Sequence, residues 1–117
     1  MNSTIESSGG SNSAIYLRCY PYDTWYLLDR QEALEARAWE LGMPAPVVYV
    51  DNGCRSGGRL DELERLLEAV EAGAYRVVIV PGPFVFSLDD QLADGMVRRF
   101  EAAGCRVMEM SRMDTYA

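Results

Sequence analysis

Apolar residues along this chain fall into two alternating kinds of segment. Four short segments are β-branched and mostly apolar, which is typical of strands buried inside a sheet. These segments cover residues 14–20, 46–51, 76–81 and 105–110. Between them lie three longer segments in which apolar residues recur every three or four positions, the spacing of an amphipathic helix.

The three expected helices are also marked by their ends. Gly42, Gly73 and Gly104 each follow one of them, where glycine commonly ends a helix. Ser87 with Asp90 three residues later resembles a capping arrangement and predicts the start of the third helix. The apolar positions are Leu34, Ala38 and Leu41 in the first helix, Leu60, Leu63, Leu66, Leu67 and Val70 in the second, and Leu88, Leu92, Met96, Val97, Phe100 and Ala103 in the third.

This order of elements predicts an α/β fold. Strands joined by single helices run parallel with right-handed crossovers, so we expect a three-layer sandwich with a mostly parallel four-stranded sheet. The first strand is expected to be central, which gives the order 2-1-3-4 found in flavodoxin-like sheets. Residues 1–13 are rich in Ser, Gly and Asn and predict a flexible tail, and residues 14–117 predict a single domain.

Function is expected in the loops at the carboxyl ends of the strands, because ligands meet such sheets there. These loops are residues 20–25, 51–59 and 81–87. The loop at 51–59 is glycine-rich and precedes a helix, a combination that can cradle an anion, although an ordinary loop is the alternative. The residues of this candidate anion loop are Arg55, Ser56, Gly57, Gly58 and Arg59.

Charge and composition exclude several function classes. The chain has 18 acidic and 11 basic residues, and a net charge of -7 opposes tight binding of the isolated chain to DNA. It has no histidine, which removes the usual general base and the commonest metal ligand, so we expect no metal and no cofactor. Three cysteines without a CxxC spacing favour reduced thiols in a cytoplasm. No apolar run approaches the ~20 residues of a membrane span.

Four motifs in order resemble the catalytic domain of serine recombinases, the resolvase and invertase family. YLRCYP at residues 16–21 is similar to the family's Y-x-R-V-S-T, and LDRQEAL at 28–34 to its D-R-Q-x-x-A-L. DNGCRSGG at 51–58 is similar to D-x-G-x-S-G with one extra residue, and LLEAVEAG at 66–73 to a leucine-rich helix that ends in glycine. The resemblance covers roughly residues 14–110 and implies the resolvase fold.

The departures from the family pattern predict that catalysis is lost. The resemblance places Tyr20 where the family has its nucleophilic serine, and GPFVF at 82–86 where the family has D-R-L-x-R. Pro83 and Phe86 thus replace the two arginines that clamp the scissile phosphate. Arg18, Tyr20, Asp51 and Ser56 remain as a vestigial site, in which Arg18 could still bind an anion or simply pair with an acid such as Asp51.

Aromatic residues cluster in two of the loops and predict a binding surface. A mouth that is polar and basic in recombinases is aromatic here, and exposed aromatic patches mark interfaces. The chain is therefore interpreted as an inactive recombinase-like module that binds a partner or a second copy of itself. The alternatives are a nucleotide or phosphate binder, a residual strand-exchange enzyme, and an accessory factor of a recombination complex. The aromatic set is Tyr20, Tyr22, Trp25, Tyr26, Phe84 and Phe86.

Overall fold

The structure is a computed structural model that describes residues 12–53 and 59–110. Four parallel strands form one sheet in the order β3-β2-β4-β5. This is the predicted order 2-1-3-4 with the first strand inside the sheet, so the predicted fold class is confirmed. The elements are β2 (Ser13–Cys19), α2 (Thr24–Glu40), β3 (Val47–Asn52), α3 (Asp61–Glu71), β4 (Val77–Val80), the 3₁₀ turn η1 (Pro83–Val85), α4 (Asp90–Ala102) and β5 (Arg106–Glu109).

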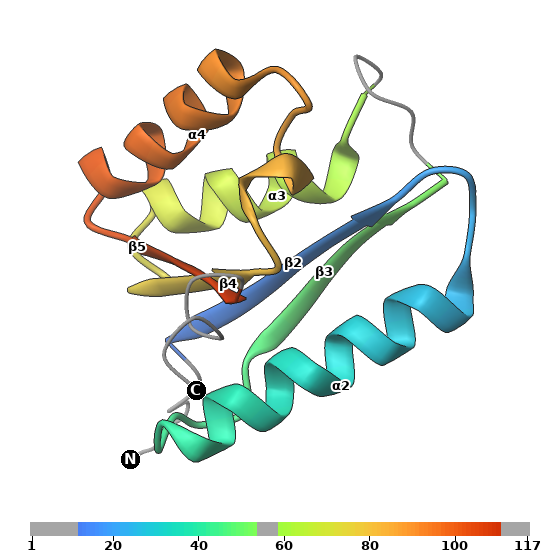
Figure 1. The fold of residues 1–117 in the computed structure, drawn as a ribbon. Coiled ribbons are helices and arrows are strands. Elements are labelled where there is room, and N and C mark those ends of the chain that lie inside the picture. Colours follow the sequence, from blue (N-terminus) through green and yellow to red (C-terminus); the bar gives the residue numbers. More distant parts are fainter. Residues whose placement is uncertain (1–11, 54–58, 111–117) are drawn as a thin grey trace.

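The fold has three layers, with α2 on one face of the sheet and α3 and α4 on the other (Figure 1). Ile15 and Leu17 of β2 face α2 and pack in one buried cluster, and Ala14 and Tyr16 face α3 and α4 in the other. The alternation is the pleat of a strand that is buried on both faces. Because β2 lies between β3 and β4, its carboxyl end sits in the middle of the sheet, where the loops after β2 and β4 meet.

The ends of the elements correct the expectations at four places. Ser13 was assigned to the flexible tail but is fully buried as the first residue of β2. Leu41 was expected to face the core but lies at the carboxyl cap of α2 with half of its surface exposed. Leu88 and Leu92 are also exposed, because α4 begins only after Leu88 and turns Ala93 rather than Leu92 toward the sheet. The glycines that end the helices are confirmed, with Gly104 at a φ of 85°.

The start of α4 is also different from the prediction. Its cap is Asp89, whose carboxylate accepts hydrogen bonds from the backbone N–H groups of Gln91 and Leu92. The Ser87 hydroxyl instead accepts from the N–H of Asp89 and stabilises the turn before the helix. An aspartate at the cap also places negative charge at the positive end of the helix dipole, which favours it over serine.

The predicted tail at residues 1–13 and the predicted domain at residues 14–117 are described only in part. Residues 1–11 of the tail, and residues 54–58 and 111–117 of the domain, lie outside the described part of the chain. Within residues 12–53 and 59–110, no helix has the length and apolar character to cross a membrane.

Candidate functional site

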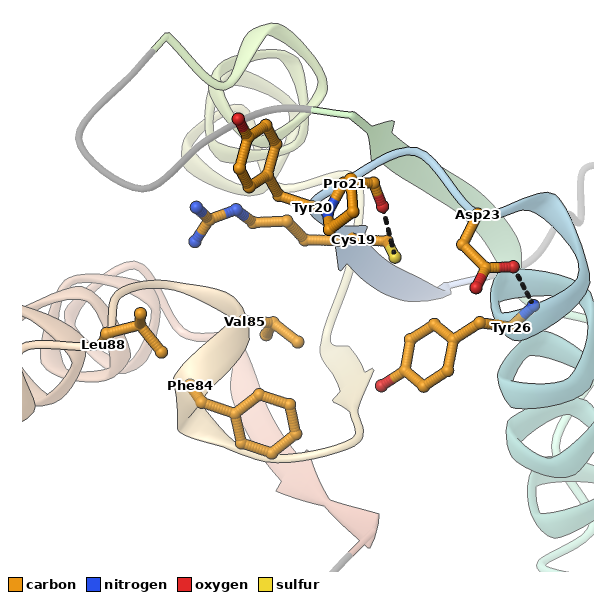
Figure 2. A pocket seen from close by; sticks show the side chains of 9 residues that line it. Cys19, Tyr20, Pro21, Asp23, Tyr26, Phe84, Val85 and Leu88 are labelled. Carbon is orange, nitrogen blue, oxygen red and sulfur yellow. Dashed lines mark hydrogen bonds between the residues drawn. The ribbon is translucent and has the colours of Figure 1, made fainter.

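A cleft of about 460 Å³ opens at the carboxyl ends of β2 and β4. Figure 2 shows its lining side chains, which come from the end of β2, the start of α2, and the segment between β4 and α4. This is the end of the sheet at which function was predicted. The lining residues are Arg18, Cys19, Tyr20, Pro21, Asp23, Tyr26, Phe84, Val85 and Leu88.

One wall of the cleft is the loop after β2, which is tied to the end of β3. The N–H of Gly53 donates to the carbonyl oxygen of Cys19 at 2.7 Å, and the N–H of Asp23 donates to Asn52 Oδ1 at 3.0 Å. Within the loop the Cys19 thiol donates to the carbonyl oxygen of Pro21 at 3.1 Å, and the peptide bond before Pro21 is cis. These contacts fix the loop, so that the exposed ring of Tyr20 stands on a defined backbone.

The Cys19 thiol in this wall is a poor nucleophile. Burial raises its pKa, and the nearby carboxylate of Asp23 raises that pKa further because a thiolate would be repelled. The reactive form of cysteine is the thiolate, so a raised pKa lowers reactivity at neutral pH. Cys54 lies outside the described residues.

The opposite wall is the turn η1. Val85 is buried beneath it, and the ring of Phe84 stands half exposed at the rim. Gly82 stands just before the turn, and a Cβ there would displace the half-exposed Phe84 ring. Because Gly82 has no side chain, the Phe84 ring can pack against the backbone of the turn.

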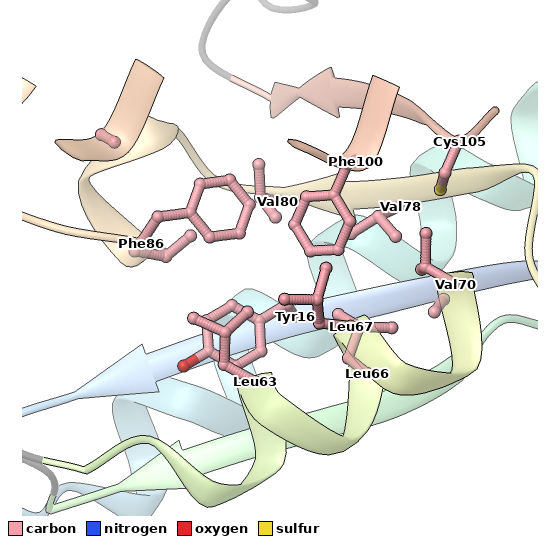
Figure 3. Packing of buried hydrophobic residues seen from close by; sticks show 13 residues of the cluster. Tyr16, Leu63, Leu66, Leu67, Val70, Val78, Val80, Phe86, Phe100 and Cys105 are labelled. Atoms are coloured by element: carbon pink, nitrogen blue, oxygen red, sulfur yellow. The ribbon is translucent and has the colours of Figure 1, made fainter. Parts of the chain in front are cut away.

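Phe86 does not belong to the mouth, and the prediction that it is exposed there is wrong. Its ring stacks on Tyr16 at a centroid distance of 6.0 Å and contacts Phe100 at 5.4 Å, and only 6% of its surface is exposed (Figure 3). A 3₁₀ turn rotates successive residues by about 120°, so residues two apart point in different directions. The turn thus sends Phe84 outward and Phe86 into the core beneath α4.

The remaining aromatic residues divide into two groups. Tyr20 and Tyr26 line the cleft together with Phe84. The guanidinium of Arg30 lies 5.7 Å from the centroid of the Tyr26 ring and covers one side of it. Tyr22 and Trp25 are exposed, at 71% and 82%, but do not line the cleft. Only Tyr20, Tyr26 and Phe84 of the six predicted aromatic residues therefore line the cleft.

Asp51 has a structural position at the end of β3. Its carboxylate is buried and accepts from the Tyr16 hydroxyl at 2.7 Å and from the backbone N–H groups of Glu62 and Leu63 at 3.0 and 3.1 Å. Three donors offset the cost of burying the charge, and the last two cap α3 from outside its own sequence. Arg18 stands opposite Asp51 in the β2–β3 ladder, so both side chains lie on the same face of the sheet.

The candidate anion loop is only partly described. Arg55, Ser56, Gly57 and Gly58 lie outside the described residues. Arg59 is described, and its guanidinium pairs with Asp61 at 2.8 Å and with Glu64 at 3.9 Å. These two carboxylates at the start of α3 already pair with the Arg59 guanidinium, so an anion bound there would compete with them for its positive charge.

Five of the nine cleft residues are not among the predicted site residues: Cys19, Pro21, Asp23, Val85 and Leu88. Asp23 was overlooked although it precedes a helix, and it caps α2 by accepting from the N–H of Tyr26 at 3.0 Å. An acidic residue three positions before that N–H is a recognisable cap signal. Val85 and Leu88 carried no such signal, because only the turn η1 decides which of its apolar side chains face the cleft.

Comparisons with known proteins give the fold. No family model matches this chain, and no curated protein matches it. Among solved structures, the catalytic domain of ISC1926 TnpA, an IS607-like serine recombinase, superposes with a TM-score of 0.76 at 18% identity, covering 84% of this chain and 68% of that one. The fold is that of a serine recombinase catalytic domain.

Two further structures agree with this result. The N-terminal catalytic domain of TP901-1 integrase has a TM-score of 0.75 at 20% identity and covers 86% of this chain and 78% of that one. A resolvase family site-specific recombinase from Streptococcus pneumoniae has a TM-score of 0.69 at 17% identity and covers 86% and 72%. At these identities the likeness concerns the serine recombinase fold, and the predicted resemblance is confirmed at that level.

Proposed function

We propose that this chain is a serine recombinase-like domain that does not cleave DNA and instead binds a protein through the cleft. One observation carries the proposal. The resemblance assigns the two phosphate-clamping arginines to Pro83 and Phe86, and Phe86 is packed inside the core. A side chain stacked between Tyr16 and Phe100 does not reach a phosphate at the mouth.

The chemistry of the cleft supports the loss of activity. Phosphoryl transfer depends on positive charge placed around the phosphate, and each lost donor of this kind costs ~10²–10³ in rate. Arg18 is the one cationic residue among the nine that line the cleft, and the carboxylate of Asp23 lies in the same lining. Apolar side chains make most of the remaining wall.

The same side chains support a role in binding protein. Phe84, Tyr20 and Leu88 are each about half exposed or more around one concave site. Aromatic side chains have few rotatable bonds, so they lose little entropy when a partner covers them. The backbone contacts of the loop after β2 reduce the ordering cost of binding further.

A cleavage assay tests the catalytic half of this proposal. Purified protein incubated with supercoiled DNA should give no nicked, linear or recombined product and no covalent protein–DNA adduct. Tyr20→Ser should be equally inactive, because a hydroxyl at residue 20 would still lack positive charge around the phosphate. An adduct that disappears in Tyr20→Phe would show that the tyrosine is a nucleophile and would overturn the proposal.

A crosslinking experiment tests the binding half. A photoreactive amino acid at position 84 should capture one defined partner, identified by mass spectrometry, and Tyr26→Ala should reduce that capture. The matched control is the same amino acid at Leu41, which is similarly exposed at the far end of α2. Equal capture at both positions, or none at position 84, would contradict binding at the cleft.

A role as an accessory factor is the second candidate, and the shared fold favours it. Two of the structures compared above are catalytic domains of a serine recombinase and an integrase, the third is a site-specific recombinase, and such a domain without activity could join an active relative. If so, the partner captured at position 84 should be a serine recombinase, and adding this chain should change its recombination rate. Phosphate and nucleotides should leave the melting temperature unchanged if anion binding has no part in function.

A further inference from the structure

Both tryptophans of the chain lie on the solvent face of α2. Trp25 and Trp39 are 82% and 81% exposed, and Leu28 between them is 43% exposed. A different side of the same helix is buried against the sheet through Leu27 and Leu34. The helix therefore has apolar residues on two faces, of which residues 12–53 and 59–110 cover only one. Packing within this described part of the chain does not account for the second face.

The exposed face has the register of a helix-packing seam. Trp25, Glu32 and Trp39 follow one another at intervals of seven residues, and Leu28 and Glu35 stand three residues after the first two. Positions spaced this way form one continuous stripe, as the a and d positions of a heptad do. The stripe between the two indoles is about 21 Å long at 1.5 Å per residue. We call these five residues the α2 seam.

The middle of the α2 seam is negative. Glu32 is exposed and has no ion-pair or hydrogen-bond partner among the described residues 12–53 and 59–110. Glu35 accepts a hydrogen bond from Gln31 at 3.3 Å, which leaves its charge in place. The two arginines of α2 stand outside the seam, where Arg30 pairs with Asp29 and Arg37 with Glu40. The seam thus presents two carboxylates between apolar ends.

This charge pattern argues against a second copy of the chain as the occupant. A symmetric dimer brings the same patch of both copies together about a two-fold axis. Residue 32 is the midpoint of the stripe, so antiparallel and parallel pairing alike would set Glu32 against its own copy. Like charges opposed in this way destabilise an interface, whereas a cation there would be favourable.

We propose that the α2 seam is a docking site for a helix of another protein, which carries a lysine or arginine at its centre and apolar residues at its ends. The cation meets Glu32 and Glu35, and the apolar residues pack on Trp25 and Trp39. Tryptophan is the side chain most enriched at binding hot spots, and electrostatic complementarity selects the partner. The site is separate from the cleft, whose lining contains none of the five residues of the α2 seam.

Intrinsic fluorescence gives a direct test, because the only tryptophans of the chain are in the seam. The probes are two synthetic helical peptides of about three heptads without tryptophan. Both carry leucine at the end positions of their seam, and they differ only in a central lysine or glutamate. The lysine peptide should shift the tryptophan emission of the protein to shorter wavelength and bind at least about tenfold more tightly than the glutamate peptide.

Variants assign the binding to the proposed contacts. Glu32→Lys should invert the preference, so that the glutamate peptide binds more tightly than the lysine peptide. Trp39→Ala should weaken binding of the lysine peptide by at least about tenfold, with emission from Trp25 as the readout. Gln91→Ala, at an exposed position on α4, is the matched control and should bind like the parent protein.

The outcomes are decisive in both directions. Inversion of the preference by Glu32→Lys supports the proposal, provided that the melting temperature is unchanged, as expected for an exposed side chain. No emission change with the lysine peptide at millimolar concentration, or equal affinity for both peptides, overturns it. Dimerisation of the parent protein in sedimentation that Trp39→Ala abolishes would assign the seam to a second copy and would also overturn it. None of these results depends on the cleft.

Discussion

Two groups of aromatic residues in this domain have opposite surroundings. Tyr16, Phe86 and Phe100 form a closed cluster beneath α3 and α4, and at most 6% of any of them is exposed. Tyr20 and Phe84 come from the same two segments and line an open cleft. Residue type is the same in both groups. What differs is position: Tyr16 lies inside β2 and Tyr20 follows its end, while the turn η1 sends Phe84 and Phe86 in different directions.

The comparison explains why aromatic residues near a functional edge are a weak indicator of function. Tyr16 lies inside a strand that is buried on both faces, whereas Tyr20 stands in the loop beyond that strand, and a 3₁₀ turn separates residues two apart by direction. One member of each pair therefore goes to the core, and the other goes to the surface. If so, substitutions in the buried cluster should lower the free energy of unfolding far more than substitutions at the cleft.

The largest expected effect is on the closed cluster. Phe86→Ala removes a buried ring that contacts both Tyr16 and Phe100 and leaves a cavity, so the free energy of unfolding should fall by ~3–5 kcal/mol. Urea denaturation followed by circular dichroism measures this change. A loss below ~1 kcal/mol would mean that Phe86 is not packed as described.

The next effect concerns the carboxylate that joins the closed cluster to α3. Asp51→Asn leaves one oxygen where two accept from three donors, and the free energy of unfolding should fall by ~1–3 kcal/mol. The matched control is Asp61→Asn, an exposed residue paired with Arg59, which should change stability by no more than ~0.5 kcal/mol. Equal losses in the two variants would remove the structural role assigned to Asp51.

A pH titration sharpens the contrast between buried and open side chains. Burial raises the pKa of Cys105 from 9.0 to about 11, so the folded state keeps the thiol protonated where the unfolded chain would ionise. The stability from this group is complete below about pH 9 and is lost as the pH rises toward 11. Cys105→Ala should flatten the fall in unfolding free energy across that window. A slope identical to that of the parent would contradict the burial of the thiol.

The smallest effect on stability is expected at the rim of the cleft. Phe84→Ala should lower the free energy of unfolding by less than ~1 kcal/mol, because half of the ring is already exposed. Gly82→Ala should displace the Phe84 ring without altering the ring stack of Phe86. Both variants should reduce crosslinking of a partner at the neighbouring Leu88 while the melting temperature stays within a few degrees. A large loss of stability in Phe84→Ala would place this ring in the core as well.

The sequence by itself determined the architecture. Short β-branched runs separated by helical periodicity leave few parallel arrangements, because crossovers are right-handed and buried strands need cover on both faces. The strand order and the end of the sheet at which the cleft lies both followed from this pattern. The four motifs that resemble serine recombinases also predicted which α/β fold this is, because their order and spacing follow the order and lengths of the strands and helices.

Only the tertiary structure decided which side chains at that end are accessible. Phe86 and Asp51 were each placed by contacts between segments distant in the chain, which local periodicity does not encode. The buried carboxylate of Asp51 depends on a hydroxyl from β2 and on N–H groups from α3. The exposure of Trp25 and Trp39 likewise depends on which face of α2 the sheet covers. Apolar residues on both faces of a helix leave that choice to packing, because either face could bury the same kind of surface.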